Sequence, residues 1–371
     1  MQKRRLGKTE LMVSCIGLGA GSRMFMERGY SGPDTPQAVI NCALDKGINF
    51  IDTARSYYKS EQIIGEVIKG RRDNCFLATK TYLRKGSRVE KDIDISLKNL
   101  QTDRIDLYQI HNITYRDELR TILGPNGALE MLKKAKRVGK INYIGVTGFR
   151  PDIIQECIQT GEFDTIQVPF NLIERTQIEE ILDLAKKFDL GIIIMRPLAR
   201  GRLKNVAAVL KFILSYPVST VIPGCSTVEH VKMNTQIGKD LNPLSSEERE
   251  KLFSDIEGNF CRGCQVCEEV CPVNFPISEI FRYETYLDFS ATFARDQYRK
   301  LSQKISTCTD CAECEKACPY NLPIRAMLKR AHGRLTKGRI EDTIINLLRR
   351  LHLYHRLREV YFDLGLPLPK R

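Results

Sequence analysis

Short apolar runs alternate with stretches of helical period along the first 238 residues of the chain. The runs are rich in Ile, Val, Leu and Phe without clean apolar–polar alternation, as is typical of parallel strands buried on both faces. One stretch between them, "TPQAVINCALDKG", begins with a Thr cap and a Pro at the first helical position and stops at a Gly. The eight strand-like runs lie at 13–19, 48–52, 75–80, 105–111, 141–147, 165–170, 191–197 and 219–224.

Eight strand–helix units in about 230 residues predict an α/β fold, namely a (β/α)8 TIM barrel with its chemistry at the carboxyl ends of the strands. A doubly wound open sheet is the competing fold. It lacks support because no G-x-G-x-x-G motif follows the first strand, and "GLGAGSR" comes nearest to one.

The pattern changes after residue 238, where a polar stretch runs into a region with helical period and no strand signal. The end of the chain combines an apolar stripe with many Arg residues, which predicts a basic amphipathic helix. We therefore divide the chain into a barrel at 1–238, a mainly α-helical domain at 239–335 and a helical tail at 336–371. The tail is expected to pack on its own barrel or on a second subunit, with a membrane-surface helix as the alternative.

Composition narrows the class of protein. Apolar residues make up 42% of the chain and charged residues 28%, and no run of eighteen apolar residues predicts a membrane span. The N-terminus lacks the apolar region of a secretion signal, so a cytoplasmic protein is expected. The formal charge of +13 would allow nucleic-acid binding, but no aromatic platform or reading helix accompanies it and no such partner is expected. Thirteen cysteines in an unexported chain indicate metal or redox chemistry rather than disulfides.

Eight of these cysteines form two cassettes, "CRGCQVCEEVCP" at 261–272 and "CTDCAECEKACP" at 308–319. C-x₂-C-x₂-C-x₃-C-P is the bacterial two-cluster pattern, in which three cysteines bind one [4Fe-4S] cluster and the fourth binds the other. This indicates a ferredoxin-like domain. Two alternatives are a local assignment, with each cassette binding its own cluster, and a zinc site. The predicted ligands are Cys261, Cys264, Cys267 and Cys318 for one cluster, and Cys308, Cys311, Cys314 and Cys271 for the second.

Four chemically active side chains lie at strand ends of the predicted barrel. Asp52 closes the second strand, and Tyr57 lies in the loop that follows. Lys80 closes the third strand and His111 the fourth. Each has an ordinary structural explanation by itself, such as a helix cap or a solvated strand end. Together they predict a carboxylate, a phenol, an ammonium and an imidazole that converge on the mouth of one barrel.

At these residues the chain resembles the aldo-keto reductases. It carries "NFIDTARSYY", "LATK", "YQIH", "IGVTG", "IQVPFN" and "VIPGCSTVEHVKMN" in the order of that family, and the cassettes make it similar to the branch with an iron–sulfur tail. The resemblance implies a catalytic tetrad in which Tyr57 is the general acid for a carbonyl that receives a hydride. Lys80, held by Asp52, would lower the pKa of Tyr57. His111 would orient the carbonyl.

The resemblance also implies binding of NADP or NAD. Thr147 and Gln167 would hold the nicotinamide carboxamide. Gly148 stands where the family usually has Asn, and Met195 stands where an aromatic ring usually stacks. The whole set implied for the cofactor is Thr147, Gly148, Gln167, Met195, Pro197, Leu198, Gly224, Ser226, His230 and Asn234.

The segment "VIPGCSTVEHVKMN" departs from the family where the 2′-phosphate of NADP would bind. Gly224, Cys225 and His230 replace the usual Lys, Ser and Arg, whereas Asn234 still matches the adenine-contacting position. Each lost cation removes a charge-assisted bond of roughly 1.5–3 kcal/mol. A weakened NADPH preference is therefore expected.

These observations predict an NAD(P)-dependent oxidoreductase that reduces a small carbonyl, or oxidises an alcohol, by hydride transfer. Its two clusters would serve electron transfer, regulation or structure, because no flavin site links two-electron to one-electron chemistry. The alternative is an iron–sulfur electron-transfer protein whose barrel docks a redox partner. A third hypothesis, a binding subunit without turnover, is disfavoured by the intact tetrad. The substrate, a redox protein partner, a homo-oligomer and the choice between NADH and NADPH stay open.

Overall fold

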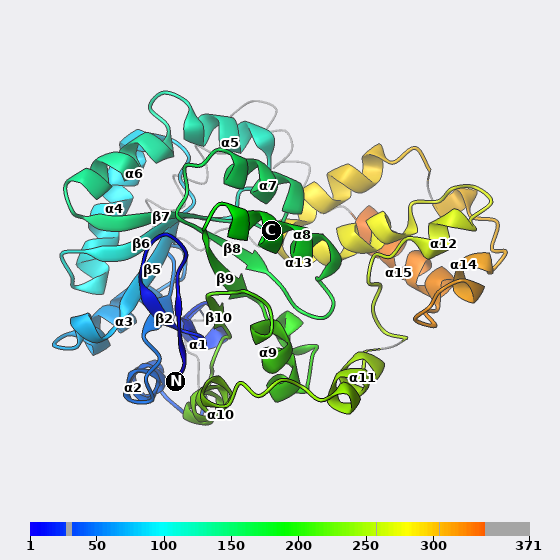
Figure 1. Ribbon diagram of the computed structural model, residues 1–371. Helices are drawn as coiled ribbons and strands as arrows, with labels where there is room; N and C mark the ends of the chain where they lie inside the picture. The colour runs from blue at the N-terminus through cyan, green and yellow to red at the C-terminus, as the bar shows by residue number, and fades with distance from the viewer. Residues whose placement is uncertain (27–31, 257, 304, 338–371) are drawn as a thin grey trace. The chain divides into compact units, whose positions relative to one another are not determined.

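Two compact units, Met1–Glu250 and Lys251–Arg371, make up the chain (Figure 1). The computed structural model describes residues 1–26, 32–256, 258–303 and 305–337. The helix predicted for the tail at 336–371 lies almost wholly outside the described residues.

The first unit runs past residue 238 because the segment after the barrel contacts the barrel again. Lys211 Nζ lies 3.6 Å from Asp240 Oδ2, and the guanidinium of Arg249 lies 5.7 Å from the centre of the Phe212 ring. A charged contact and a ring contact therefore hold this polar segment on the first unit.

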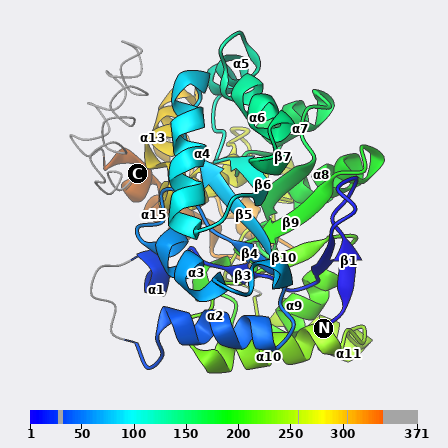
Figure 2. The same ribbon diagram turned by 90° about the vertical axis from the view of Figure 1, so that its left-hand side faces the viewer.

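Eight parallel strands in the order β3 to β10 form the predicted barrel (Figures 1 and 2). Isolated parallel bridges from Ile16 to Val221 and from Gly19 to Gly224 join the last strand to the first. The (β/α)8 prediction is thus confirmed. The strands are β3 Leu18–Gly19, β4 Phe50–Asp52, β5 Phe76–Thr81, β6 Ile105–Ile110, β7 Ile141–Thr147, β8 Thr165–Pro169, β9 Gly191–Met195 and β10 Thr220–Ile222.

Helices surround this sheet, and the predicted cap of the first long one is present. Thr35 accepts a hydrogen bond from the Ala38 N–H, Pro36 opens the helix, and Gly47 follows its end with a φ of 86°. The helices of the first unit are α1 Arg23–Met26, α2 Pro36–Asp45, α3 Ser60–Ile68, α4 Gly86–Leu100, α5 Arg116–Leu123, α6 Ala128–Arg137, α7 Pro151–Gln159, α8 Thr176–Lys187, α9 Val206–Leu214 and α10 Val228–Lys239, with α11 Ser246–Ser254 crossing into the second.

The run predicted as one strand at 13–19 is divided in the structure. Its first part belongs to β2 (Met12–Ser14), which pairs antiparallel with β1 (Lys3–Arg5), and only Leu18–Gly19 enters the barrel. Between them the Ser14 hydroxyl donates to the Ile16 carbonyl oxygen and fixes the change of direction. Every residue from 13 to 19 is buried, so hydrophobic pattern could not separate the two parts.

The second unit is helical, and its two halves repeat at a spacing of 47 residues, the distance from Cys261 to Cys308. No strand occurs after residue 250 in the described ranges. Nor does any helix in the part of the chain that the structure describes have the length and apolar character to cross a membrane. The elements are α12 Val266–Glu269, α13 Ile277–Lys300, η3 Ile305–Thr307, α14 Glu313–Lys316 and α15 Ile324–Thr336.

Polar contacts between α13 and α15 hold the two halves together. The Tyr298 hydroxyl and His332 Nδ1 lie 2.6 Å apart, and the buried Glu284 accepts from Arg330 Nε at 3.3 Å and Arg334 Nη1 at 2.9 Å. Because each contact joins one half of the repeat to the other, the halves form a single folded unit.

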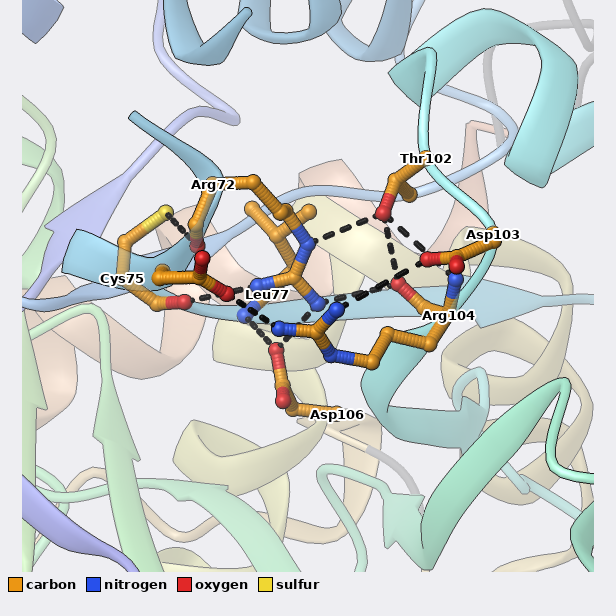
Figure 3. A network of polar contacts seen from close by, with 8 residues as sticks. Arg72, Cys75, Leu77, Thr102, Asp103, Arg104 and Asp106 are labelled. Atoms are coloured by element: carbon orange, nitrogen blue, oxygen red, sulfur yellow. Dashed lines mark hydrogen bonds and ion pairs between the residues drawn. The ribbon is translucent and has the colours of Figure 1, made fainter. Parts of the chain in front are cut away.

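An arginine network ties together the amino-terminal ends of β5 and β6 (Figure 3). Arg72 Nη2 donates to Asp106 Oδ2 at 2.7 Å, and the same oxygen accepts from the Leu77 N–H at 2.8 Å. Arg72 Nη1 also donates to the Cys75 carbonyl oxygen at 2.8 Å. The network lies at the end of the barrel opposite the predicted chemistry, and it links β5 to β6 through Asp106.

We expect Arg72→Met to lower the free energy of unfolding by roughly 1.5–3 kcal/mol, the range for hydrogen bonds to a charged group, because Asp106 would be left buried without its cation. The matched control is Arg104→Met, which breaks the exposed pair with Asp73 and should cost about 1 kcal/mol or less. Urea unfolding of the full chain measures both. Equal losses of unfolding free energy in the two variants would contradict the conclusion that Arg72 stabilises the barrel through the buried Asp106.

Candidate active site

A buried ion pair lies at the centre of the site. Lys80, near the end of β5, donates from Nζ to Asp52 Oδ2 at 2.6 Å and to the Thr53 carbonyl oxygen at 2.7 Å. Both charged side chains are almost wholly buried. Burial raises the pKa of Asp52 and lowers the pKa of Lys80, and the opposite charge of the partner resists both changes. The pair is therefore stable as a unit, and removal of either member would leave an uncompensated buried group.

Two buried amides extend this pair toward the neighbouring strands. Gln109 Nε2 in β6 lies 3.3 Å from Asp52 Oδ1 and 2.9 Å from Gln167 Oε1. Gln167 Nε2 in turn reaches Asp52 Oδ2 at 3.5 Å and Met195 Sδ at 3.8 Å. The interactions join β4, β5, β6, β8 and β9. Gln109 was not among the predicted site residues, although a polar residue inside the apolar run "IDLYQIH", two positions before His111, was a usable signal.

Tyr57 meets the other predicted residues at the mouth of the barrel. Its ring centre lies 5.3 Å from Lys80 Nζ and 5.7 Å from the His111 ring, which it meets edge-on. On the other side, a Cβ added to Gly21 would stand 2.9 Å from Tyr57 Cε2. Only a glycine therefore leaves room for the phenol here, and the structure brings all four predicted tetrad residues together.

The sequence-based expectation that Lys80 lowers the pKa of Tyr57 is wrong for the protein by itself. Burial raises the pKa of Tyr57 well above its usual value, and the negative charge of Asp52 raises it further. Burial is the largest cause, and the Lys80 ammonium does not offset it because Lys80 is paired with Asp52 at 2.6 Å. Tyr57 consequently keeps its proton at neutral pH.

Two residues outside the predicted site, Tyr82 and Arg84, hold His111. The Tyr82 ring stacks on His111 at a centre-to-centre distance of 4.0 Å and an angle of 16°. Arg84 Nη2 donates to the carbonyl oxygens of His111 and Asn112 at 3.0 and 2.9 Å. No motif identified these residues, since Tyr82 and Arg84 act through a stack and through backbone atoms.

The predicted nicotinamide positions follow β7, β8 and β9. Thr147 Oγ1 accepts from the Asn112 N–H at 2.7 Å, which stabilises the left-handed Asn112 (φ 51°) after β6. A Cβ at Gly148 would stand 2.9 Å from Ile154 Cδ1 and 3.1 Å from the Ile113 carbonyl oxygen. The local packing thus accounts for a glycine where the related family usually has Asn. Pro197 and Leu198 follow β9 directly.

The predicted adenine and phosphate positions cluster around β10 and the start of α10. Gly224 pairs with Gly19 across the barrel closure, and His230 Nδ1 accepts from the Ser226 N–H at 3.3 Å. Asn234 donates from Nδ2 to Cys225 Sγ at 3.3 Å, whereas its buried Oδ1 has no hydrogen-bond partner among the described residues. A buried acceptor of this kind suits an amino group such as that of adenine.

Two cavities in the second unit are lined by cysteine sulfurs. Each takes three cysteines from one cassette and the fourth from the other, with apolar side chains such as Phe281 and Leu328 completing the walls. Within the described part of the chain, no three His, Cys, Asp or Glu side chains converge closely enough to hold a single ion. The first cavity contains Cys261, Cys264, Cys267 and Cys318, and the second contains Cys308, Cys311, Cys314 and Cys271.

The backbone around these cysteines also suits a cluster with negatively charged sulfur ligands. The Gly263 N–H donates to Cys261 Sγ and the Phe275 N–H to Cys271 Sγ, both at 3.4 Å. Four thiols, apolar walls and amide donors to sulfur are the donor set and surroundings that a [4Fe-4S] cluster requires. The residues present therefore fit the group that the cassettes predict.

Comparison with known proteins gives matches for both parts of the chain. The model of the aldo/keto reductase family matches residues 16–208, and the model of the 4Fe-4S dicluster domain matches residues 257–322. The aldo-keto reductase YhdN of Bacillus subtilis is 36% identical over 217 residues, which cover 55% of this chain and 64% of that protein. The aldo-keto reductase yakc [NADP(+)] of Schizosaccharomyces pombe is 33% identical over 209 residues, or 51% of this chain and 59% of that one. The chain thus spans less than two thirds of the length of these two relatives.

A solved structure agrees with the fold. The holo form of aldo-keto reductase AKR11C1 from Bacillus halodurans superposes with a TM-score of 0.59 at 28% identity, covering 68% of this chain and 95% of that one. The similarity thus extends over nearly the whole of that reductase.

We expect Lys80→Met to lower the free energy of unfolding by about 3–5 kcal/mol, because it leaves the Asp52 carboxylate buried and unpaired. The double variant Lys80→Met/Asp52→Asn removes both charges and should recover part of this loss. Thermal and urea unfolding of the single and double variants would measure the coupling. Additive losses in the double variant would show that the two charges do not act as a pair.

Proposed function

The chain belongs to the aldo/keto reductase family and carries a C-terminal 4Fe-4S dicluster domain, and from this premise we propose that it transfers a hydride between a nicotinamide dinucleotide and a small carbonyl or alcohol, with Tyr57 as the proton donor. The observation that carries the proposal is the convergence of Tyr57, the Asp52–Lys80 pair and His111 at the carboxyl ends of the strands. In this fold catalytic groups occupy that end of the barrel.

The bound dinucleotide would supply or accept the hydride. The side chains would stabilise the charge that develops on the carbonyl oxygen. Reduction leaves negative charge on the carbonyl oxygen, which needs a proton and a nearby donor. The Tyr57 phenol is protonated at neutral pH and so carries the proton that this role requires, although burial raises its pKa and makes donation harder. The ammonium of Lys80, 5.3 Å from the ring centre, would stabilise the charge that develops on Tyr57 as its proton leaves.

His111 and Tyr82 would set the direction from which the carbonyl approaches. The His111 ring packs between the face of Tyr82 and the edge of Tyr57, so its orientation is fixed before a substrate arrives. A fixed imidazole beside the proton donor is suited to orient a carbonyl oxygen. The substrate class is therefore a carbonyl small enough to enter beside these three rings.

The dinucleotide would lie across the ends of β7 to β10, where the predicted contacts occur. Asn234 Oδ1 would accept from the adenine amino group, and Gln167 and Thr147 would hold the carboxamide. The relative from Schizosaccharomyces pombe carries NADP(+) in its name. We propose that this chain accepts NADH as well, because the 2′-phosphate position has His230 in place of an Arg.

The eight cassette cysteines would hold two [4Fe-4S] clusters, which would supply one-electron transfer. The crossed sets of sulfurs in the two cavities support this assignment over a local one. They also support a second candidate function, an iron–sulfur electron carrier whose barrel docks a redox partner. The two candidates differ in what they require of Tyr57.

We expect Tyr57→Phe to lower NAD(P)H-dependent carbonyl reduction by about 10²–10⁴-fold, the usual contribution of a positioned general acid. Iron and sulfide content should stay at the level of the unmodified protein. The matched control is Tyr58→Phe, which removes the hydroxyl of the neighbouring, 44% exposed tyrosine and should leave turnover unchanged. Unaltered turnover in Tyr57→Phe would exclude the reductase mechanism and favour the electron carrier.

The pH profile gives a second readout for Tyr57. The acid must be protonated to act, and its pKa is raised well above 10. Reduction by the unmodified protein should consequently show no loss from ionisation of Tyr57 as the pH rises to about 9.5, since ordinary phenols lose their proton near pH 10. A decline centred near pH 7 that disappears in Tyr57→Phe would contradict the raised pKa.

For the dinucleotide, we expect the dissociation constants of NADPH and NADH to differ by less than tenfold. His230→Arg should then favour NADPH by about tenfold or more, since one charge-assisted bond contributes roughly 1.5–3 kcal/mol and 1.4 kcal/mol is a factor of ten. Gln236→Arg adds the same charge farther along α10 and serves as the control. Fluorescence titration with each dinucleotide measures the two dissociation constants. A tenfold NADPH preference in the unmodified protein would refute the expectation.

A further inference from the structure

The 47-residue repeat allows the two cysteine cavities to be compared position by position. The backbones match closely: φ is 74° at Gly263 and 58° at Asp310, and 66° at both Gln265 and Ala312. The short helices α12 and α14 begin directly after the last pair. The backbone angles thus agree at these positions, and the two cavities differ there in their side chains.

The first cavity has a cation on its wall between its first two cysteines. The guanidinium carbon of Arg262 lies 4.1 Å from the centre of the Tyr320 ring and 5.2 Å from that of Phe253. Arg262 Nη2 also donates to the Phe253 carbonyl oxygen at 3.0 Å. The equivalent residue of the second cassette is the neutral Thr309.

The second cavity also has an arginine on its wall, Arg325, but carboxylates surround it. Its Nε and Nη2 donate to Glu315 Oε2 at 3.0 and 2.9 Å, and its Nη1 lies 3.5 Å from Asp310 Oδ1. Asp310 occupies the position of Gly263 in the first cassette. The exposed Lys329, 3.8 Å from Asp310, approaches that carboxylate as a further partner.

The first half of the repeat also differs at the position equivalent to Arg325. Ser278 occupies that position, and its hydroxyl and N–H both donate to Glu268. Between the first two ligand cysteines the first cassette therefore has Arg-Gly and the second Thr-Asp. This is a difference of two charges between the first two ligand cysteines of each cassette.

Reduction adds an electron to a cluster, and a nearby positive charge stabilises the reduced form. We propose that the cluster held by Cys261, Cys264, Cys267 and Cys318 has the higher reduction potential and that Arg262 sets this difference. An electron that enters the second unit would then move to the first cavity and stay there. The inference rests on the proposed binding of two clusters.

The test is a redox titration of the full-length protein, purified without oxygen and followed by electron paramagnetic resonance. Two one-electron steps should appear. Arg262→Gln should lower the upper step by a tenfold change in its equilibrium constant, about 59 mV for a one-electron couple, and leave the lower step in place. Thr309→Arg, which places a cation at the equivalent position of the second cassette, should raise the lower step.

Two controls separate charge from packing. Arg262→Lys keeps the positive charge and should keep the upper potential, whereas Arg299→Gln removes an exposed charge of α13 and should move neither step. The proposal is overturned if Arg262→Gln moves the lower step or no step, or if Thr309→Arg leaves both potentials unchanged. It is equally overturned if iron and sulfide analysis finds fewer than two clusters.

The outcome for Tyr57 is independent of these measurements. Two clusters with the expected shifts, together with an unaffected Tyr57→Phe, would sustain the inference and remove the reductase function. If turnover depends on Tyr57 but the two clusters have equal potentials, the reductase function is sustained and the inference is overturned.

Discussion

The barrel is organised around one buried attraction, that between the Lys80 ammonium and the Asp52 carboxylate. Charges taken out of water are tolerated only when their partners are close and their remaining hydrogen bonds are satisfied. Lys80 meets this condition with the Thr53 carbonyl oxygen, and Asp52 meets it with two amides. Those amides belong to β6 and β8, so the demands of one ion pair fix side chains on several strands. The positions of these side chains at the rim therefore follow from the hydrogen bonds that the buried ion pair requires.

The same pair determines how the proposed proton donor behaves. An isolated ammonium near a phenol would lower its pKa, whereas one matched by a carboxylate leaves burial as the dominant influence. The phenol is then held protonated, with its ring confined by the backbone at Gly21 on one side and by His111 on another. A fixed ring and a retained proton are both what the proposed role of Tyr57 requires.

The sequence predicted those features that depend on local pattern and chain order. The barrel followed from eight buried runs, and the meeting of Asp52, Lys80 and His111 followed from their places at strand ends. Pattern failed where two buried segments are adjacent, as in the divided run at 13–19. It failed also for Tyr82 and Arg84, which contact His111 through a ring stack and through backbone carbonyl oxygens. The direction of the Tyr57 pKa depends first on how deeply the phenol is buried, which no motif contains.

The crossed arrangement of the cassette cysteines has a consequence for how the protein is made. Cys318 lines the first cavity and Cys271 the second, so neither cavity has its four sulfurs until the ribosome has synthesised both halves of the repeat. A nascent chain that ends between the halves would contain three cysteines of the first cavity and would lack the fourth, Cys318. If the cavities hold the two proposed clusters, neither cluster has its full set of ligands until the later half has been synthesised and has folded.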